Sequence, residues 1–96
     1  MELAIFGRFH ARAGKEAELA ALLRGQLGLV RAEAGCLSID TFRSTRDARL
    51  FYLHSRWVDE AAFDLHATLP QTLQFLERVR PLIDHPLDVA RTTRLG

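Results

Sequence analysis

The chain has few of the residues that mark secreted, metal-bound or membrane-embedded proteins. It holds one cysteine, Cys36, so no internal disulfide can form, and no group of cysteines and histidines has zinc-site spacing. No apolar run approaches the roughly 20 residues that cross a bilayer, and the first residues lack the basic and then apolar pattern of a signal peptide. We therefore expect a reduced, cytoplasmic location, no membrane partner and no metal centre.

An excess of charge of one sign is also missing. The 13 lysine and arginine residues nearly balance 12 aspartate and glutamate residues, and no basic run occurs. A surface that follows phosphates needs clustered basic residues, so nucleic acid is not an expected partner. With 96 residues, 48% of them hydrophobic, the chain is expected to form one domain over residues 1–96 with a modest core.

Residues 50–57, with the sequence LFYLHSRW, have the alternation of a β-strand. Successive strand side chains point to opposite faces, which places Phe51, Leu53 and Trp57 on one face and Leu50 and Tyr52 on the other. Large apolar groups on both faces indicate a strand near the middle of a sheet, packed on each side. The same kind of alternation predicts strands over residues 3–11, 36–43 and 87–95.

Helical spacing appears between these strands. A leucine-rich stripe predicts one helix over residues 15–34, after which Gly35 suits a left-handed conformation. Asp59 fits the N-cap of a second helix, because its carboxylate can accept hydrogen bonds from first-turn amides. Pro70 is expected to interrupt that helix and to begin a new one, since proline is tolerated in a first turn but not in an interior.

The predicted order is β-α-β-β-α-β, with the second helical region broken in two. This order is typical of the α+β ferredoxin-like sandwich, in which a four-stranded antiparallel sheet carries its helices on one face. The other face would then expose Phe6, Leu50 and Tyr52. We therefore predict a homodimer formed through these sheet faces.

Three stretches, taken in order, resemble a known family: FHARAGKEAEL, VRAEAGCLSIDTFRS and FYLHSRWVDEAAFDLHATLPQTLQFL. They are similar to the antibiotic biosynthesis monooxygenase domains, within the dimeric α+β barrel superfamily. The resemblance implies a small aromatic or hydrophobic metabolite held between the sheet and the helices of one subunit. It also implies oxidation by O₂ without flavin, metal or haem, in which the substrate loses a proton and its carbanion passes an electron to O₂.

The sequence departs from the family pattern at two positions. Ser55 stands where the family commonly has glutamate, and Gln71 stands where a histidine commonly follows the proline, whereas His66 matches the first histidine of that motif. In the haem-degrading branch of the superfamily, an asparagine aligns with Gly7 and the iron ligand aligns near Phe75. Because neither residue can take those roles, we expect no haem and no other cofactor.

The resemblance and the alternation together suggest roles for seven residues. His66 would accept a proton and Trp57 would form a wall that stacks on a flat substrate, although both residues also suit purely structural roles. Two further functions remain open, a non-catalytic dimer that binds a small hydrophobic metabolite and an isomerase of a small metabolite. The expected substrate-binding residues are Phe51, Leu53 and Phe75 as pocket walls, and Ser55 or Gln71 to orient an oxygen atom.

Overall fold

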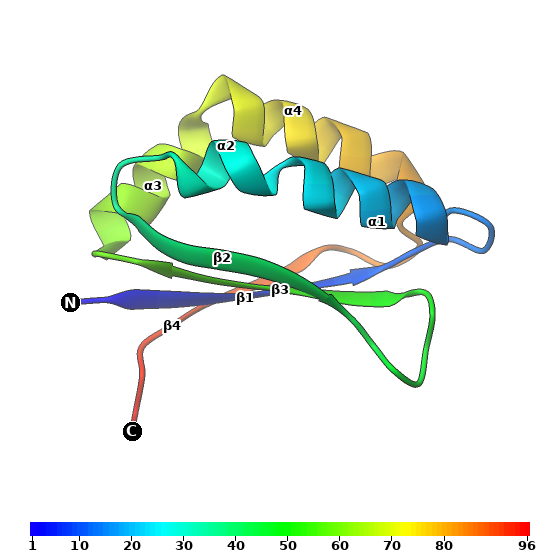
Figure 1. The fold of residues 1–96 in the computed structure, drawn as a ribbon, viewed down its shortest axis with the longest axis horizontal. Coiled ribbons are helices and arrows are strands. Elements are labelled where there is room, and N and C mark those ends of the chain that lie inside the picture. The colour runs from blue at the N-terminus through cyan, green and yellow to red at the C-terminus, as the bar shows by residue number, and fades with distance from the viewer.

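The computed structural model describes residues 1–96 and shows a four-stranded antiparallel sheet with all helices on one face (Figure 1). The sheet order is β2-β3-β1-β4, so β1 and β3 are the central strands. This arrangement confirms the ferredoxin-like α+β fold. The strands are β1 (Leu3–His10), β2 (Cys36–Arg43), β3 (Leu50–Trp57) and β4 (Asp88–Thr92), and the helices are α1 (Glu16–Gly25), α2 (Leu27–Arg31), α3 (Glu60–Thr68), α4 (Pro70–Val79) and the short 3-10 helix η1 (Arg80–Leu82).

The register of the two central strands determines which side chains face the helices. Ile5 pairs with Ser55 and Phe9 pairs with Phe51, and all four are at most 3% exposed. Buried side chains form two clusters between the sheet and the helices. One cluster contains Phe9, Ala11, Leu19, Leu23, Phe51, Val79 and Leu82, and the other contains Leu3, Ile5, Val30, Ile39 and Trp57.

The first helical region differs from its prediction. In place of one helix over residues 15–34, α1 and α2 are separated at Gln26. Gly25 and Gly28 flank this point, and glycine costs a helix about 1 kcal/mol relative to alanine. Gly35 has a φ of +86°, as predicted for a left-handed position. Gln26 lies at this break and lines the space between the sheet and the helices.

The second helical region follows its prediction. The Asp59 carboxylate accepts a hydrogen bond of 2.9 Å from the amide of Ala62 and caps α3. Leu69 is extended, and Pro70 occupies the first turn of α4. The final strand, β4, is shorter than the predicted residues 87–95 and pairs only with β1.

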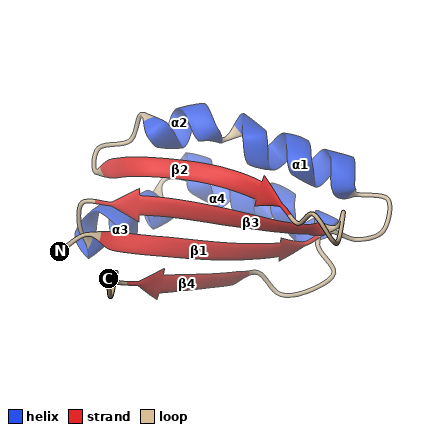
Figure 2. Ribbon diagram, turned by 60° about the horizontal axis from the view of Figure 1, so that its bottom comes forward, coloured by secondary structure: helices blue, strands red, loops and turns tan.

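The sheet face opposite the helices is not covered, as Figure 2 shows with the strands toward the viewer. Three aromatic side chains lie exposed on this open sheet face: Phe6 is 52% exposed, Phe42 53% and Tyr52 41%. Phe42 and Tyr52 are paired across β2 and β3. The open sheet face therefore combines these exposed aromatic rings with polar side chains such as Arg8 and His54. None of the helices has the length and hydrophobicity needed to cross a bilayer.

Candidate active site

A cavity of about 350 Å³ lies between the sheet and the helices, and 10 of its 16 lining residues are hydrophobic. Ile5, Leu53 and Ser55 line it from the central strands, while His66 and Phe75 line it from α3 and α4. Small-molecule sites in proteins have volumes of roughly 300–1,000 Å³ and mostly apolar walls with a few polar groups. The cavity therefore has the size and character of a site for one small, largely apolar molecule.

His66 is the histidine in the cavity wall, and a carboxylate fixes the position of its ring. Its Nδ1 atom lies 2.7 Å from Oε1 of Glu33, and the two side chains are only 13% and 10% exposed. A carboxylate can only accept, so the hydrogen of this bond belongs to Nδ1. In the neutral ring, Nε2 then keeps a lone pair and is the nitrogen that can accept a proton.

Gln71 and Thr72 complete the polar group around Glu33. The amide of Gln71 donates to the second carboxylate oxygen of Glu33 over 2.6 Å, and the Thr72 hydroxyl lies 3.4 Å from Nδ1 of His66. Gln71 is not part of the cavity lining. The structure therefore places Gln71 beside the partner of His66, where it holds a carboxylate, instead of at the cavity surface.

Trp57 lies behind the cavity wall. Its side chain is fully buried, and its ring is 4.7 Å from that of His66 and 5.7 Å from that of Phe63, measured between centroids. The indole Nε1 donates to Oγ of Ser55 over 3.0 Å. The indole ring therefore packs against the His66 ring, and it does not itself line the cavity.

The remaining predicted site residues also include some that line the cavity and one that does not. Leu53, Ser55 and Phe75 line the cavity together with His66. Phe51 does not, because it packs into the neighbouring core cluster with the Arg43 guanidinium 4.7 Å from its ring centroid. The Ser55 hydroxyl accepts from the indole and keeps its own hydrogen for a further acceptor.

Two polar cavity residues were not among the predicted site residues, although Gln26 falls on the leucine-rich stripe of the first predicted helix. The Nε2 atom of Gln26 is buried without a hydrogen-bond partner, and its side chain lines the cavity. A buried amide without a partner costs about 1–3 kcal/mol, which a ligand oxygen would recover. Arg91 also lines the cavity, but its guanidinium donates to Glu60 and Asp64 over 3.0 and 2.6 Å. The hydrogen bonds that Arg91 donates to Asp64 and Glu60 raise the pKa of Arg91, and the two carboxylates balance its charge.

Cys36 is not one of the residues that line the cavity. Burial raises the pKa of its thiol above the ordinary value, with a smaller contribution from the charge of Glu33. The thiolate is the reactive form of cysteine, so this environment is the opposite of one that activates a nucleophile.

Comparison with known proteins agrees with the fold. The sequence profile described as "Antibiotic biosynthesis monooxygenase" matches residues 3–78. "Putative monooxygenase Rv0793" of Mycobacterium tuberculosis is 32% identical over 87 residues, which are 91% of this chain and 85% of that protein. The solved structure of Rv0793 has a TM-score of 0.93 at 29% identity and covers 100% of this chain and 97% of the other.

Two further relatives extend the comparison. "Putative monooxygenase YcnE" of Bacillus subtilis is 34% identical over 62 residues, or 65% of each chain. The structure of SnoaB, a cofactor-independent oxygenase from Streptomyces nogalater, has a TM-score of 0.89 at 18% identity, covers 99% of this chain and 94% of the other, and shows a common fold. Because the profile match covers most of the sequence, the chain belongs to the antibiotic biosynthesis monooxygenase family.

Proposed function

We propose that the protein is a cofactor-independent monooxygenase that oxidises a small phenolic, quinol-like or polyketide-like metabolite with O₂. The observation that carries this proposal is the position of His66 in the wall of an apolar cavity, with Nδ1 bonded to the buried carboxylate of Glu33. The names of the two curated relatives support the reaction class. The cavity volume of about 350 Å³, near the lower end for ligand sites, favours a small substrate.

Proton removal is the step that His66 would perform. Nε2 accepts a proton from the substrate, and the Glu33 carboxylate balances the charge of the resulting imidazolium. The substrate anion then passes an electron to O₂, and the two radicals combine. In an anthrone, one oxygen atom of O₂ replaces two hydrogens of the ring methylene and the other leaves as water, so no external reductant is needed.

Two donors at the cavity would hold the developing anion. The buried amide of Gln26 lacks a partner, and the Ser55 hydroxyl has a hydrogen to donate. Donors that are already in place stabilise charge in an apolar site better than water does, because they need no reorganisation. Trp57 acts in this scheme as a positioning residue, since its ring packs against that of His66 at 4.7 Å between centroids.

A homodimer is part of the proposal. Phe6, Phe42 and Tyr52 are 41–53% exposed on the open sheet face, and several large aromatic side chains exposed on one face favour a protein partner there. A second copy related by twofold symmetry would cover these residues with the same residues of its own. Sedimentation velocity measures the mass directly, and a monomer at micromolar concentration would contradict this assembly.

O₂ uptake with a panel of anthrones and hydroquinones tests the reaction. His66→Ala should lower kcat by roughly 10²–10⁴-fold, the usual contribution of a general base. His54→Gln is the matched control, because His54 lies on the open sheet face and outside the cavity. The dimeric state of His54→Gln is to be measured in parallel, because the open sheet face is the proposed dimer interface.

Unchanged turnover in His66→Ala would remove His66 from the mechanism. Two other results would indicate a function different from the proposed one. Tight binding of the panel without O₂ uptake would indicate a non-catalytic metabolite-binding dimer, and an isomerised product formed under anaerobic conditions would indicate an isomerase.

A further inference from the structure

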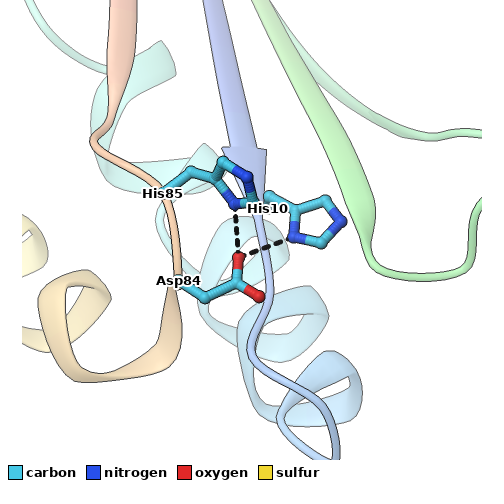
Figure 3. Close-up of side chains that lie close together, drawn as sticks. All are labelled: His10, Asp84 and His85. Atoms are coloured by element: carbon cyan, nitrogen blue, oxygen red, sulfur yellow. Dashed lines mark hydrogen bonds and ion pairs between the residues drawn. The ribbon is translucent and has the colours of Figure 1, made fainter.

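A second group of chemically active side chains lies outside the cavity, where the end of β1 meets the connection from η1 to β4. His10, Asp84 and His85 point toward one another there (Figure 3). Nδ1 of His10 and Nδ1 of His85 lie 2.6 and 2.7 Å from the same oxygen, Oδ1 of Asp84. The three possible ligand atoms all fall within 4.8 Å of one another.

The hydrogen-bond pattern of His10 favours a bound cation beside Asp84. Its Nδ1 faces Asp84, and its Nε2 faces Oδ2 of Asp47 at 3.3 Å. Both partners are carboxylates, which only accept, but a neutral imidazole has a single N–H. One nitrogen lone pair of a neutral His10 would therefore point at an anionic oxygen. A metal ion bound to Nδ1 and Asp84 would leave the single N–H on Nε2, facing Asp47, and so would match both contacts.

Neighbouring side chains form hydrogen bonds to the candidate ligands. Metal ligands in proteins commonly have outer-sphere partners of this kind. The Arg49 guanidinium donates to the other oxygen of Asp84, Oδ2, over 2.7 Å and to the carbonyl of Ala11 over 3.0 Å. Asp47 accepts from the ring nitrogen of His10 that faces away from the cluster. Ligating histidines commonly bond their second nitrogen to a carboxylate, which fixes the ring orientation and strengthens the ligand.

We propose that His10, Asp84 and His85 bind a divalent first-row transition-metal ion, with Zn²⁺ as the probe of this class. Two imidazoles and one carboxylate are ligands that such ions accept, and water would complete the coordination. Ligands about 2.1 Å from a tetrahedral ion lie roughly 3.4 Å apart. Each histidine nitrogen, now 2.6 or 2.7 Å from the Asp84 oxygen, would move away from it by less than about 1 Å, and the two nitrogens, which lie within 4.8 Å of each other, would settle at about the same 3.4 Å separation. His85 is 60% exposed, so an ion can enter from solvent.

The site would join three segments that are distant in sequence. His10 ends β1, Asp84 and His85 precede β4, and Arg49 connects the group to the turn before β3. Bound metal should therefore stabilise the folded chain, because an ion that binds only the folded form shifts the unfolding equilibrium.

Untagged, metal-free protein titrated with Zn²⁺ by calorimetry, and with Co²⁺ by visible absorption, tests the proposal at pH 7.5. We expect one ion per chain, a cobalt d–d band and a rise in Tm with Zn²⁺. Asp84→Asn and His85→Ala should each weaken Zn²⁺ binding at least tenfold and abolish the rise in Tm. His54→Gln, which changes a histidine outside the cluster, should bind as the parent protein does.

His85→Ala keeps the test valid if Asp84→Asn fails to fold, because the exposed His85 ring contributes little to packing. Absence of Zn²⁺ heat and of a cobalt band at millimolar metal would overturn the proposal. Equal binding by His85→Ala and the parent protein would also overturn it, because the ion would then lie elsewhere.

Discussion

Replacing Glu33 by alanine should destabilise the protein far more than replacing it by glutamine. The Glu33 side chain is 10% exposed and accepts two hydrogen bonds, from His66 at 2.7 Å and from Gln71 at 2.6 Å. Glu33→Ala leaves both donors without a partner, and each buried unsatisfied donor costs about 1–3 kcal/mol. We therefore expect the free energy of unfolding to fall by about 2–5 kcal/mol.

Glutamine keeps the shape and one acceptor oxygen at this position. In Glu33→Gln the oxygen can still accept from His66, while the Gln71 amide can turn its own oxygen toward the new NH₂ group. The loss of stability should stay near 1 kcal/mol. The imidazolium would nevertheless lose its counter-charge, and a charge-assisted bond of about 1.5–3 kcal/mol corresponds to a rate loss of about ten- to hundredfold.

Urea denaturation measures the first effect without reference to any substrate. Trp57 is the only tryptophan, and its ring lies 4.7 Å from that of His66, so its fluorescence reports on this region. In a chain of this size, 1 kcal/mol shifts Tm by about 4–8 °C, which thermal unfolding resolves easily. If Glu33→Ala and Glu33→Gln proved equally stable, Glu33 would not be the acceptor that holds His66.

Three other outcomes are expected. Gly35→Ala should cost at least about 2 kcal/mol, because Gly35 has a φ of +86° and a Cβ there would come within 2.6 Å of a side-chain carbon on α3. Gly14→Ala is the matched control, since Gly14 has a φ of +85° and open space around it, so that equal losses would exclude the steric explanation. Phe6→Glu should shift the protein toward monomer in sedimentation velocity, and an unchanged dimer would place the interface elsewhere. The Arg56 hydrogen bond lowers the pKa of Glu2, so this pair stabilises the fold above the unfolded pKa and is lost as pH falls. The stability difference between Glu2→Gln and the parent protein should therefore shrink below about pH 4 in pH-dependent urea titrations, and a constant difference would contradict the assigned pair.

Strand positions could be predicted from the sequence because alternation records burial directly. The bounds of β2 and β3 agree with the predicted residues 36–43 and 50–57. The end of β4 depends on a partner instead. Thr92 pairs with Ala4 near the start of β1, so the residues after Thr92 have almost no strand left to pair with. The end of β4 is thus determined by where its partner strand β1 begins, and the sequence of residues 93–95 itself does not record it.

The environment of His66 could not be predicted from local pattern. Its partner Glu33 is 33 residues away, and only the packing of α3 and α4 beside the end of α2 brings the two together. Alternation places Trp57 on the helix-facing side of β3, but it does not tell whether the ring reaches the cavity. The rings of His66 and Phe63 pack against the indole, and this packing determines that the indole does not line the cavity.

The cluster of His10, Asp84 and His85 illustrates the same limit more strongly. Metal-site prediction from sequence relies on short spacings within one or two segments. Here one ligand ends the first strand and the other two precede the last strand, which are adjacent only because β4 pairs with β1. No spacing rule contains that information.

The single extended residue between α3 and α4 has a consequence for how the polar group is assembled. In one uninterrupted helix, positions 66 and 71 would be rotated by about 140° from each other around the axis, too far to share a carboxylate. The bend at Leu69 and Pro70 redirects the chain so that His66 and Gln71 meet at Glu33 from two directions. A variant that joined the two helices smoothly would thus disperse these side chains while leaving every one of them in the sequence.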